Sequence, residues 1–278
     1  MEPYSVLMSV YIRENPQFFD RAIESILCQT VPTDDFVIVC DGPLNQEHYD
    51  ILDKYKQAYP GVINDIRLSQ NVGIGAAANI GLQACRNELI AKMDADDLAV
   101  PDRCEKQLRR FADNPQLTVL GGFIEEFGQD ENQPYDVRSV PLTNEEIRVF
   151  ARRRQPFNNV TVMYRKSAVV AVGGYHALRR AEDYDLYCRL LHSGYYAENL
   201  SDVLVKVRAD RDARGRRTSW ETLRGFIYAR WRAYRLGFSS LVDFAVSCGA
   251  QCVMFVCPRK LQNFIYSRFL RTKPESAE

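Results

Sequence analysis

The sequence predicts an α/β protein with a mostly parallel sheet, helices on both faces of the sheet and a helical extension at the C-terminal end. Three observations lead to this fold class. Short apolar runs alternate with segments of helical periodicity through the first 115 residues. The connections between them are only a few residues long, as in successive β-α units. Two of the apolar runs end at an aspartate, which predicts polar side chains at the carboxyl edge of the sheet, where such folds bind ligands.

The first half of the chain is a series of β-α units. Strands are expected at residues 4–10, 36–40, 63–69 and 88–93. The helices that follow them are expected at about 16–29, 46–58, 75–85 and from 101 onward. Asn15 and Pro16 provide an N-cap and a first-turn proline. Leu89-Ile90-Ala91 is apolar at consecutive positions, which is typical of a strand buried on both faces.

The second half is less regular. Strands are expected at 118–123, 159–164 and 203–208, and a polar loop at 128–135. Helices are expected at 143–154, at 166–172 and from Glu182 onward. A charged loop at 209–217 then leads to three helices rich in aromatic and basic residues, at 218–234, 240–256 and 259–270.

Composition indicates a reduced intracellular protein. The chain has 278 residues, 46% of them hydrophobic, which is enough for a sizeable core. Its eight cysteines are scattered and several lie in apolar runs, so we expect free thiols. Cys248, Cys252 and Cys257 have no fourth cysteine or nearby histidine to complete a zinc site. The first residues lack the pattern of a secretory signal, and we expect a cytoplasmic protein.

The net charge of zero conceals an asymmetry. Residues 203–278 carry 15 basic and 6 acidic side chains, whereas residues 1–202 carry 21 basic and 30 acidic ones. A basic tail of this kind suits an anionic partner such as phosphate or a lipid surface. Two interpretations of the apolar run at 241–257 stay open. It is an interfacial region at an anionic inner leaflet, or it packs against the body of the protein.

Three acids, Asp94, Asp96 and Asp97, follow the buried strand directly. They repel one another unless a positive group lies between them, and a hard divalent cation is one such group. The alternative is a solvated acidic turn in which Asp97 opens the next helix. The turn at 71–78 matches a loose dinucleotide-binding pattern, but it follows the third strand rather than the first. We interpret it as a tight turn that leaves Asn71 and Asn79 available to a nucleotide.

Four motifs in order resemble those of a family 2 glycosyltransferase of the GT-A fold. The motifs are Val39-x-Asp41-Gly42, Asn71-x-Gly73 with Ala77-x-Asn79-x-Gly81, Asp94-Ala95-Asp96-Asp97, and Glu182-Asp183-Tyr184-Asp185-Leu186. Residues 156–175 and 182–271 are similar to the branch that builds bacterial capsules, exopolysaccharides and O-antigens. The resemblance implies an inverting enzyme that moves a hexose-type sugar from a UDP-sugar to a hydroxyl of an oligosaccharide or a polyprenyl-diphosphate-linked glycan. It implies no nucleic-acid partner.

The resemblance also implies roles for single residues on the donor side. Asp41 would accept a hydrogen bond from the uracil N–H, with Ser9 and Tyr11 beside the base. Asp94 would hold the ribose or a metal-bound water, and Asp96 would bind Mn²⁺ or Mg²⁺, which bridges the diphosphate. Asp97 would support this site or cap the next helix. Arg208 and the arginines at 211, 214, 216 and 217 are candidates for a loop over the diphosphate.

On the acceptor side, Asp183 would be the general base and Glu182 would bind the acceptor or the donor sugar. Asp185 is expected to pair with Arg189 one turn later. The chain departs from the family pattern at Ala78, where relatives commonly carry arginine, and at Asn159, where they often carry histidine.

The expected organisation has two parts. Residues 1–208 form the catalytic domain, with a nucleotide-binding half at 1–115 and an acceptor-binding half at 116–208. Residues 209–278 form a basic loop and a helical tail that is peripheral on the inner face of the cell membrane under the first interpretation above. A sugar nucleotidyltransferase is a rival activity, but residues 9–16 lack the glycine-rich basic loop which that class carries. A non-catalytic binding module is the rival from another class.

Overall fold

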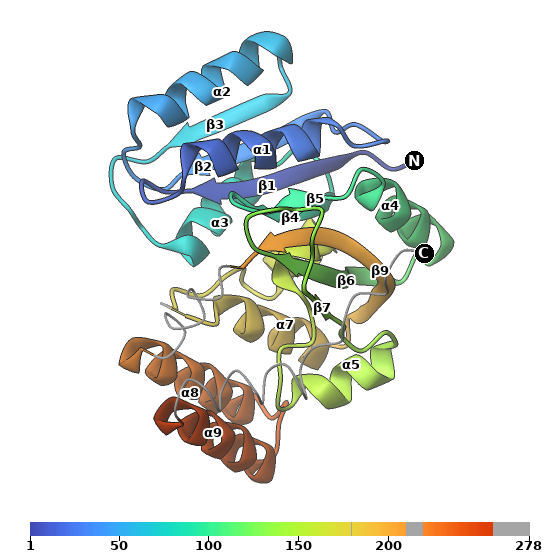
Figure 1. Cartoon of the computed structure of the whole chain (residues 1–278). Helices are drawn as coiled ribbons and strands as arrows, with labels where there is room; N and C mark the ends of the chain where they lie inside the picture. Colours follow the sequence, from blue (N-terminus) through green and yellow to red (C-terminus); the bar gives the residue numbers. More distant parts are fainter. Residues whose placement is uncertain (179, 210–218, 258–278) are drawn as a thin grey trace.

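A computed structural model describes residues 1–178, 180–209 and 219–257 (Figure 1). Their strands form one nine-stranded sheet in the order β3-β2-β1-β4-β8-β6-β9-β5, with β7 paired to β6. The strands are β1 Tyr4–Val10, β2 Asp35–Cys40, β3 Ile63–Arg67, β4 Leu89–Asp94, β5 Leu98–Ala99, β6 Leu117–Phe127, β7 Asp136–Arg138, β8 Met163–Arg165 and β9 Tyr196–Arg208.

The N-terminal half of the sheet is parallel, as predicted. β1 pairs in parallel with both β2 and β4, and β2 pairs in parallel with β3. β8 is antiparallel to β4 and β6, whereas β6 and β9 are again parallel. The register places Ser9 opposite Asp94, and Val10 opposite Cys40 just before Asp41. The carboxyl ends of β1, β2 and β4 therefore meet at one edge of the sheet.

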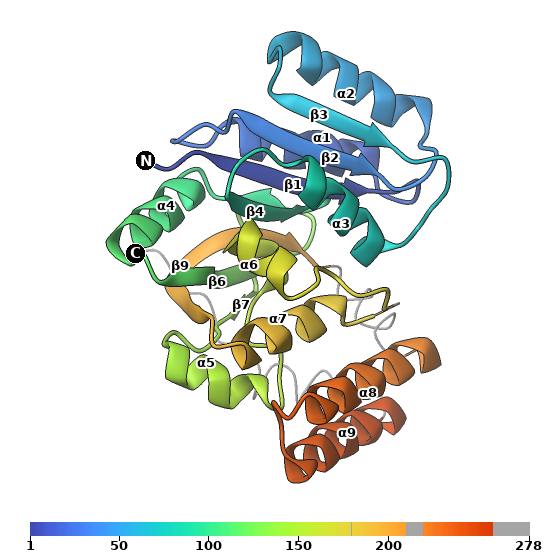
Figure 2. The ribbon, with the colours of Figure 1, turned by 180° about the vertical axis from the view of Figure 1, so that it is seen from behind.

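Helices cover both faces of this sheet (Figures 1 and 2). The helices are α1 Pro16–Leu27, α2 Gln46–Ala58, α3 Ile74–Ala84, α4 Arg103–Asp113, α5 Asn144–Ala151, α6 Lys166–Ala171, α7 Glu182–His192, α8 Trp220–Arg235 and α9 Leu241–Val256. Apolar side chains of α1, α2 and α4 share one core with the sheet, and those of α3, α5, α6 and α7 share the other. The α/β fold class is thus confirmed.

The two C-terminal helices form an outer layer on the second face. α8 packs against α7, and α9 packs against α8 as the outermost helix of the described chain (Figure 2). The apolar run predicted at 241–257 forms α9, and both interpretations of that run stay open. No helix within the described ranges is long and apolar enough to cross a membrane. The helix predicted at 259–270 lies outside the described residues, as does most of the loop predicted at 209–217.

Several predicted boundaries were wrong. Residues 159–164 were predicted as a strand, but a 3-10 helix occupies Asn159–Thr161 before β8 begins at Met163. The carbonyl of Asn158 accepts hydrogen bonds from both the backbone N–H and the hydroxyl of Thr161, at 2.8 and 2.7 Å, which closes this turn. Val160 and Val162 are buried in either conformation, so the apolar pattern alone did not distinguish the two. The short strand β5 was missed, and β9 begins seven residues before the predicted start.

Candidate functional site

The carboxyl edge of the sheet and the first turn of α7 carry most of the predicted site residues. Ser9 lies beside Asp94 in the strand register, and Tyr11 follows β1 with its side chain exposed. The hydroxyl oxygen of Ser9 is buried, and within the described residues it has no hydrogen-bond partner. A buried hydroxyl of this kind is an exception in folded proteins, and it is suited to a ligand that supplies the missing bond.

Asp41 holds the glycine turn between β3 and α3. Its carboxylate accepts hydrogen bonds from the backbone N–H groups of Val72 and Gly73, at 2.7 and 3.1 Å. The Asn71 side chain donates to the Asp41 carbonyl at 3.1 Å. Gly42 has a φ of +93°, and a Cβ there would lie 2.9 Å from the Asn71 nitrogen, so this approach requires glycine. Each carboxylate oxygen keeps a second lone pair that can accept from a ligand.

The Asn79 side chain forms hydrogen bonds with the backbone of Tyr175. Its amide nitrogen donates to the Tyr175 carbonyl at 2.7 Å, and its amide oxygen accepts from the Tyr175 N–H at 2.8 Å. The side chain thereby connects α3 to the loop that precedes α7. The amide keeps a second N–H and a second lone pair, so the predicted contact between Asn79 and a nucleotide stays a prediction.

The three clustered acids have different surroundings. Asp94 and Asp96 are partly exposed, whereas Asp97 is buried and accepts a hydrogen bond from the Arg208 backbone N–H at 2.9 Å. Burial raises the pKa of Asp97 well above its usual range, and the neighbouring Asp96 and Asp94 raise it further. Asp97 does not cap the next helix, because Asp102 is the N-cap of α4. The helix-capping role expected for Asp97 was therefore wrong.

The residues at this edge fit a cation that is shared with a substrate. No group of three Asp, Glu, His or Cys side chains converges on a metal position within the described parts of the chain. Mg²⁺ is commonly held by one or two carboxylates together with substrate phosphates, and it does not need a complete cage of protein ligands. Asp94 and Asp96 can supply that smaller set. Repulsion within the acidic cluster, seen in the raised pKa of Asp97, is what a cation would relieve.

The helix α7 begins with Glu182 and Asp183, which lie close enough to Asp94 for the charges to interact. Ala181, which precedes them, has a φ of +61°, and among the described residues it alone of the non-glycine residues is left-handed. Such strain persists where the surrounding structure enforces it, and it is frequent at functional sites. Gly75 in the first turn of α3 allows a close approach, since a Cβ there would lie 3.5 Å from the Glu182 side chain.

Asp183 is held by two hydrogen bonds. Its carboxylate accepts from the Tyr184 N–H at 2.7 Å and from the Gln155 side-chain amide at 2.6 Å. Burial raises the pKa of Asp183, and the two donors oppose that rise. Burial and the adjacent Asp183 raise the pKa of Glu182 to about 7. Both acids therefore hold protons more tightly than free carboxyl groups do.

Lys92 and Gln155 are site residues that sequence reasoning missed. Lys92 is buried in β4, and burial lowers its pKa while the charges of Asp94, Glu182 and Asp183 oppose that change. It thus interacts electrostatically with acids at the end of β4 and at the start of α7. A lysine inside an apolar strand was the available signal. Gln155 lies 28 positions before Asp183, and no local pattern indicated their contact.

Arg208 lies beside the acidic cluster. Its guanidinium carbon is 3.8 Å from the ring centre of Phe18 and 4.7 Å from that of Phe127. Its Nε is buried, and no hydrogen-bond partner for it occurs in the described residues. The structure thus places Arg208 near Asp96 and Asp97. Burial lowers the pKa of Arg208, and the charges of these two acids oppose that change. The arginines at 211, 214, 216 and 217 lie outside the described residues.

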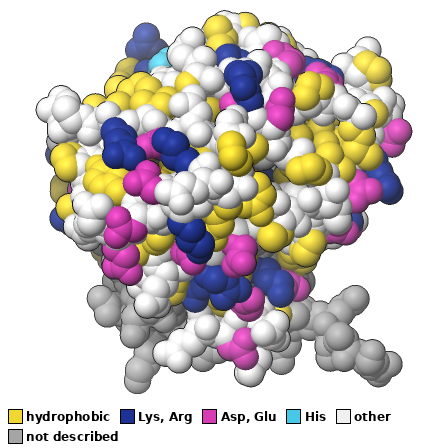
Figure 3. Space-filling model, turned by 90° about the horizontal axis from the view of Figure 1, so that it is seen from above, with side chains coloured by type: hydrophobic (Ala, Val, Ile, Leu, Met, Phe, Trp, Pro, Cys, Tyr) yellow, Lys and Arg dark blue, Asp and Glu magenta, His cyan; other side chains and the backbone are white. Residues whose placement is uncertain are grey.

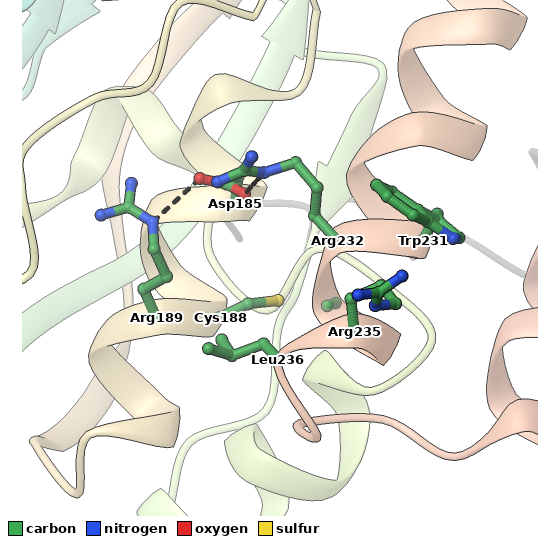
Figure 4. Close-up of a pocket in the computed structure, with 8 residues that line it drawn as sticks. Asp185, Cys188, Arg189, Trp231, Arg232, Arg235 and Leu236 are labelled. Atoms are coloured by element: carbon green, nitrogen blue, oxygen red, sulfur yellow. Dashed lines mark hydrogen bonds and ion pairs between the residues drawn. The ribbon is translucent and has the colours of Figure 1, made fainter.

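The pairing of Asp185 with Arg189 is confirmed, and the pair belongs to a larger network. Asp185 is buried and accepts from Arg189 Nε at 2.9 Å and from Arg232 Nε of α8 at 2.6 Å. His176 Nδ1 lies 2.8 Å from the same carboxylate. Figure 4 shows Arg189 and Arg232 reaching Asp185 from two sides of a cavity of about 260 Å³ between α7 and α8. The network connects α8 to the helix that carries Asp183.

Comparison with known proteins identifies the family. The family model described as Glycosyl transferase family 2 matches residues 5–179. The chain belongs to glycosyltransferase family 2. The predicted glycosyltransferase class of enzyme is thereby confirmed, and the two rival classes are not supported.

Relatives of this glycosyltransferase include proteins named for polysaccharide synthesis. The amylovoran biosynthesis glycosyltransferase AmsE of Erwinia amylovora is 36% identical over 233 residues, which are 84% of this chain and 85% of AmsE. The UDP-Gal:alpha-D-GlcNAc-diphosphoundecaprenol beta-1,3-galactosyltransferase of Escherichia coli is 30% identical over 268 residues, which are 96% of each chain.

A solved structure supports the fold of this glycosyltransferase. The mannosyltransferase PcManGT from Pyrobaculum calidifontis, solved with GDP-Man and Mn²⁺, matches with a TM-score of 0.63 at 15% identity. The match covers 94% of this chain and 83% of PcManGT. At this identity the likeness concerns the fold, and the predicted GT-A fold is confirmed.

Proposed function

We propose that this enzyme transfers a hexose-type sugar from a UDP-sugar to a hydroxyl of a lipid-linked glycan, with inversion, in the synthesis of a surface polysaccharide. The observation that carries the proposal is the placement of two acidic groups about one crevice. Asp94 and Asp96 lie at the end of β4, Asp183 lies at the start of α7, and the buried Lys92 interacts with acids on both sides.

The donor half of the proposal rests on the edge formed by β1, β2 and β4. Asp41, with its remaining lone pairs, accepts from the uracil N–H, and Ser9 and Tyr11 flank the base. Asp94 would bind the ribose or a metal-bound water, and Asp96 with Asp94 would hold Mn²⁺ or Mg²⁺. When bound, the cation supplies positive charge to the diphosphate and stabilises the UDP that leaves. The UDP-Gal in the name of the Escherichia coli relative supports a UDP-sugar donor.

The acceptor half rests on α7. Asp183 accepts the proton of the acceptor hydroxyl as its oxygen attacks the anomeric carbon. The Tyr184 N–H and Gln155 orient the carboxylate, and the raised pKa of Asp183 makes it a stronger base than a free aspartate. Glu182 binds a sugar hydroxyl. Attack on the face opposite the leaving UDP inverts the anomeric centre.

The nature of the acceptor is proposed from the relatives. The name of the Escherichia coli enzyme contains a diphosphoundecaprenol-linked sugar, and AmsE is named for biosynthesis of amylovoran, so both support a polysaccharide pathway. A polyprenyl-diphosphate-linked glycan is the acceptor that these names favour.

Calorimetry with UDP tests the donor site. We expect UDP to bind at least about tenfold more tightly with Mn²⁺ than with a chelator, because the cation joins two carboxylates to the diphosphate. Asp96→Asn should remove most of this difference. Asp113→Asn, an exposed acid at the end of α4, serves as the control. Equal affinity with and without Mn²⁺ would contradict the metal-dependent part of the proposal.

A further inference from the structure

The outermost helix α9 directs polar side chains into the protein and apolar side chains outward, the reverse of a helix at a water-exposed surface. Two of its polar residues, Asp243 and Ser247, are buried and each is 7% exposed, whereas Gln251 is partly buried. Asp243 accepts from Arg153 Nε at 2.5 Å and from the hydroxyl of Ser240, so its charge is directed into the protein. Surface helices of water-soluble domains usually show the opposite arrangement, with charged residues outward.

The outward side of α9 is apolar or small throughout. Leu241, Val242, Val253 and Val256 are between 61% and 78% exposed, and Val246 is 49% exposed. The other exposed positions of the helix are Ala245, Gly249, Ala250 and Cys252. No charged residue follows Asp243 as far as Cys257. We call these nine outward residues the α9 face. A continuous apolar surface of this kind usually marks a contact with a partner or a membrane.

Aromatic side chains of α8 adjoin the α9 face. Trp220, Tyr228 and Trp231 are 63%, 46% and 40% exposed. With Phe244 of α9 they line a hollow of about 970 Å³, which Ala177 and Leu178 of the loop before α7 also border. One acid and one base of α8, Glu221 and Arg224, line it as well. Tryptophan and tyrosine gather at the boundary between lipid and water, because their rings are apolar and their N–H or O–H groups are polar.

The charge of the C-terminal sequence favours an anionic partner. Among the described residues, α8 carries one acid, Glu221, and four arginines at positions 224, 230, 232 and 235. Residues 203–278 carry 15 basic and 6 acidic side chains, and Asp243 among the acids is turned inward. The opposite end of the molecule, above α2, mixes both signs of charge (Figure 3). A two-fold contact between copies of this chain would bring like charges together, which is unfavourable. An anionic lipid surface attracts basic residues and accepts the apolar face.

We propose that the α9 face and the α8 aromatics rest on an anionic lipid bilayer, with α9 lying in the plane of the interface. The helical hairpin formed by α8 and α9 is joined to the catalytic body at three places. Arg232 bonds Asp185, Arg153 bonds Asp243, and the Arg230 guanidinium lies 3.5 Å from the ring centre of Tyr184. Tyr184 is next to Asp183. A bilayer under α9 thus holds the crevice at a fixed height above the lipid headgroups.

Co-sedimentation of the full-length protein with vesicles tests this proposal. We expect binding to vesicles of phosphatidylglycerol and phosphatidylcholine, and at least about tenfold weaker binding to phosphatidylcholine alone. The variant Val246→Asp/Val253→Asp should bind the mixed vesicles at least about tenfold more weakly, because the charges would enter the apolar layer. Val149→Asp is the matched control, since Val149 is 65% exposed on α5 and lies outside the α9 face. It should bind as the unmodified protein does.

Three results would overturn the proposal. These are no binding to either vesicle, equal binding to both, and unchanged binding of the double variant. Light scattering that shows a dimer which the double variant dissociates would assign the α9 face to a second copy instead. The milder Val246→Ser/Val253→Ser variant answers the question if the aspartates prevent folding. The bilayer contact does not depend on the proposed reaction, so Asp183→Asn should bind vesicles normally even though it fails in catalysis.

Discussion

The carboxylate of Asp183 is held by two donors of different origin. The Tyr184 N–H belongs to the first turn of the same helix, whose start the acidic pair in the sequence indicated. The Gln155 amide comes from a loop 28 residues earlier, and its contact depends on how that loop folds. Local patterns could therefore predict that Asp183 begins a helix in the crevice, but not what orients its carboxylate.

Glu182 should give the free enzyme a specific pH dependence of stability. Burial and Asp183 raise its pKa from 4.5 to about 7, so the folded protein keeps a proton that the unfolded chain has released. This contribution to the free energy of unfolding is fully present below pH 4.5 and is lost as the pH rises through about 7. Glu182→Gln should remove this loss of stability with rising pH. One pKa unit corresponds to about 1.4 kcal/mol, so we expect an effect of about 1–3 kcal/mol.

Urea unfolding near pH 5 and near pH 8 measures this difference. Relative to the unmodified protein, Glu182→Gln should gain stability at the higher pH. The exposed Glu145 on α5 offers a control, because Glu145→Gln should leave the pH dependence unchanged. A parallel pH dependence in the unmodified protein and Glu182→Gln would show that the proton is not held at Glu182.

At the scale of elements, α7 connects the proposed reaction site with the C-terminal hairpin formed by α8 and α9. One end of the helix bears Glu182 and Asp183 after the left-handed Ala181. One turn further on, Asp185 binds Arg189 of the same helix and Arg232 of α8. The spacing in the sequence predicted the first of these pairs. The second joins residues 47 positions apart, and no periodicity within one helix could indicate it.

Breaking the contact between α7 and α8 should loosen the hairpin selectively. Arg232→Met removes the donor to Asp185 while it keeps most of the side-chain volume. Because hydrogen bonds to charged groups contribute about 1.5–3 kcal/mol, we expect a loss of stability of that order. Hydrogen exchange should quicken in α8 and α9 but not in β1, β2 and β4.

Arg235→Met is the matched control for this change. Arg235 lies on the same helix, but its guanidinium is placed over the ring of Trp231 at 5.3 Å rather than against Asp185. It should have little effect on exchange in α9. Uniform acceleration across the whole sheet in Arg232→Met would contradict a local role for this contact.

At the scale of the whole molecule, the sequence was sufficient to predict the fold class and that Ser9, Asp41 and Asp94 lie at the carboxyl edge of the sheet. Strands β1 to β4 are consecutive β-α units, so the short connections predicted that they are parallel, but not that they lie in the order β3-β2-β1-β4. The second half was harder to predict, because β8 inserts antiparallel between β4 and β6 and β9 returns to pair with both β6 and β5. Such long-range pairings leave no local pattern. The inward polar side of α9 also required the structure, because burial of Asp243 depends on Arg153.

The arrangement of the molecule places donor groups, base and hairpin in one continuous body. Asp41 and Asn71 are joined at the donor turn, and Asn79 ties α3 to the loop before α7. Lys92 interacts with the acids of both halves. The central claim is that this body brings a single base, Asp183, to the acceptor hydroxyl.

Turnover and UDP affinity of Asp183→Asn, measured side by side, test that claim most directly. The amide keeps the shape of the side chain but cannot take the proton, so we expect turnover to fall by about 10²–10⁴-fold. The affinity for UDP with Mn²⁺ should stay within about twofold of the unmodified enzyme, because Asp183 lies on the acceptor side of the crevice. Asp113→Asn, remote and exposed, should change neither quantity. Turnover of Asp183→Asn within a few-fold of the unmodified enzyme would contradict the assignment of Asp183 as the base.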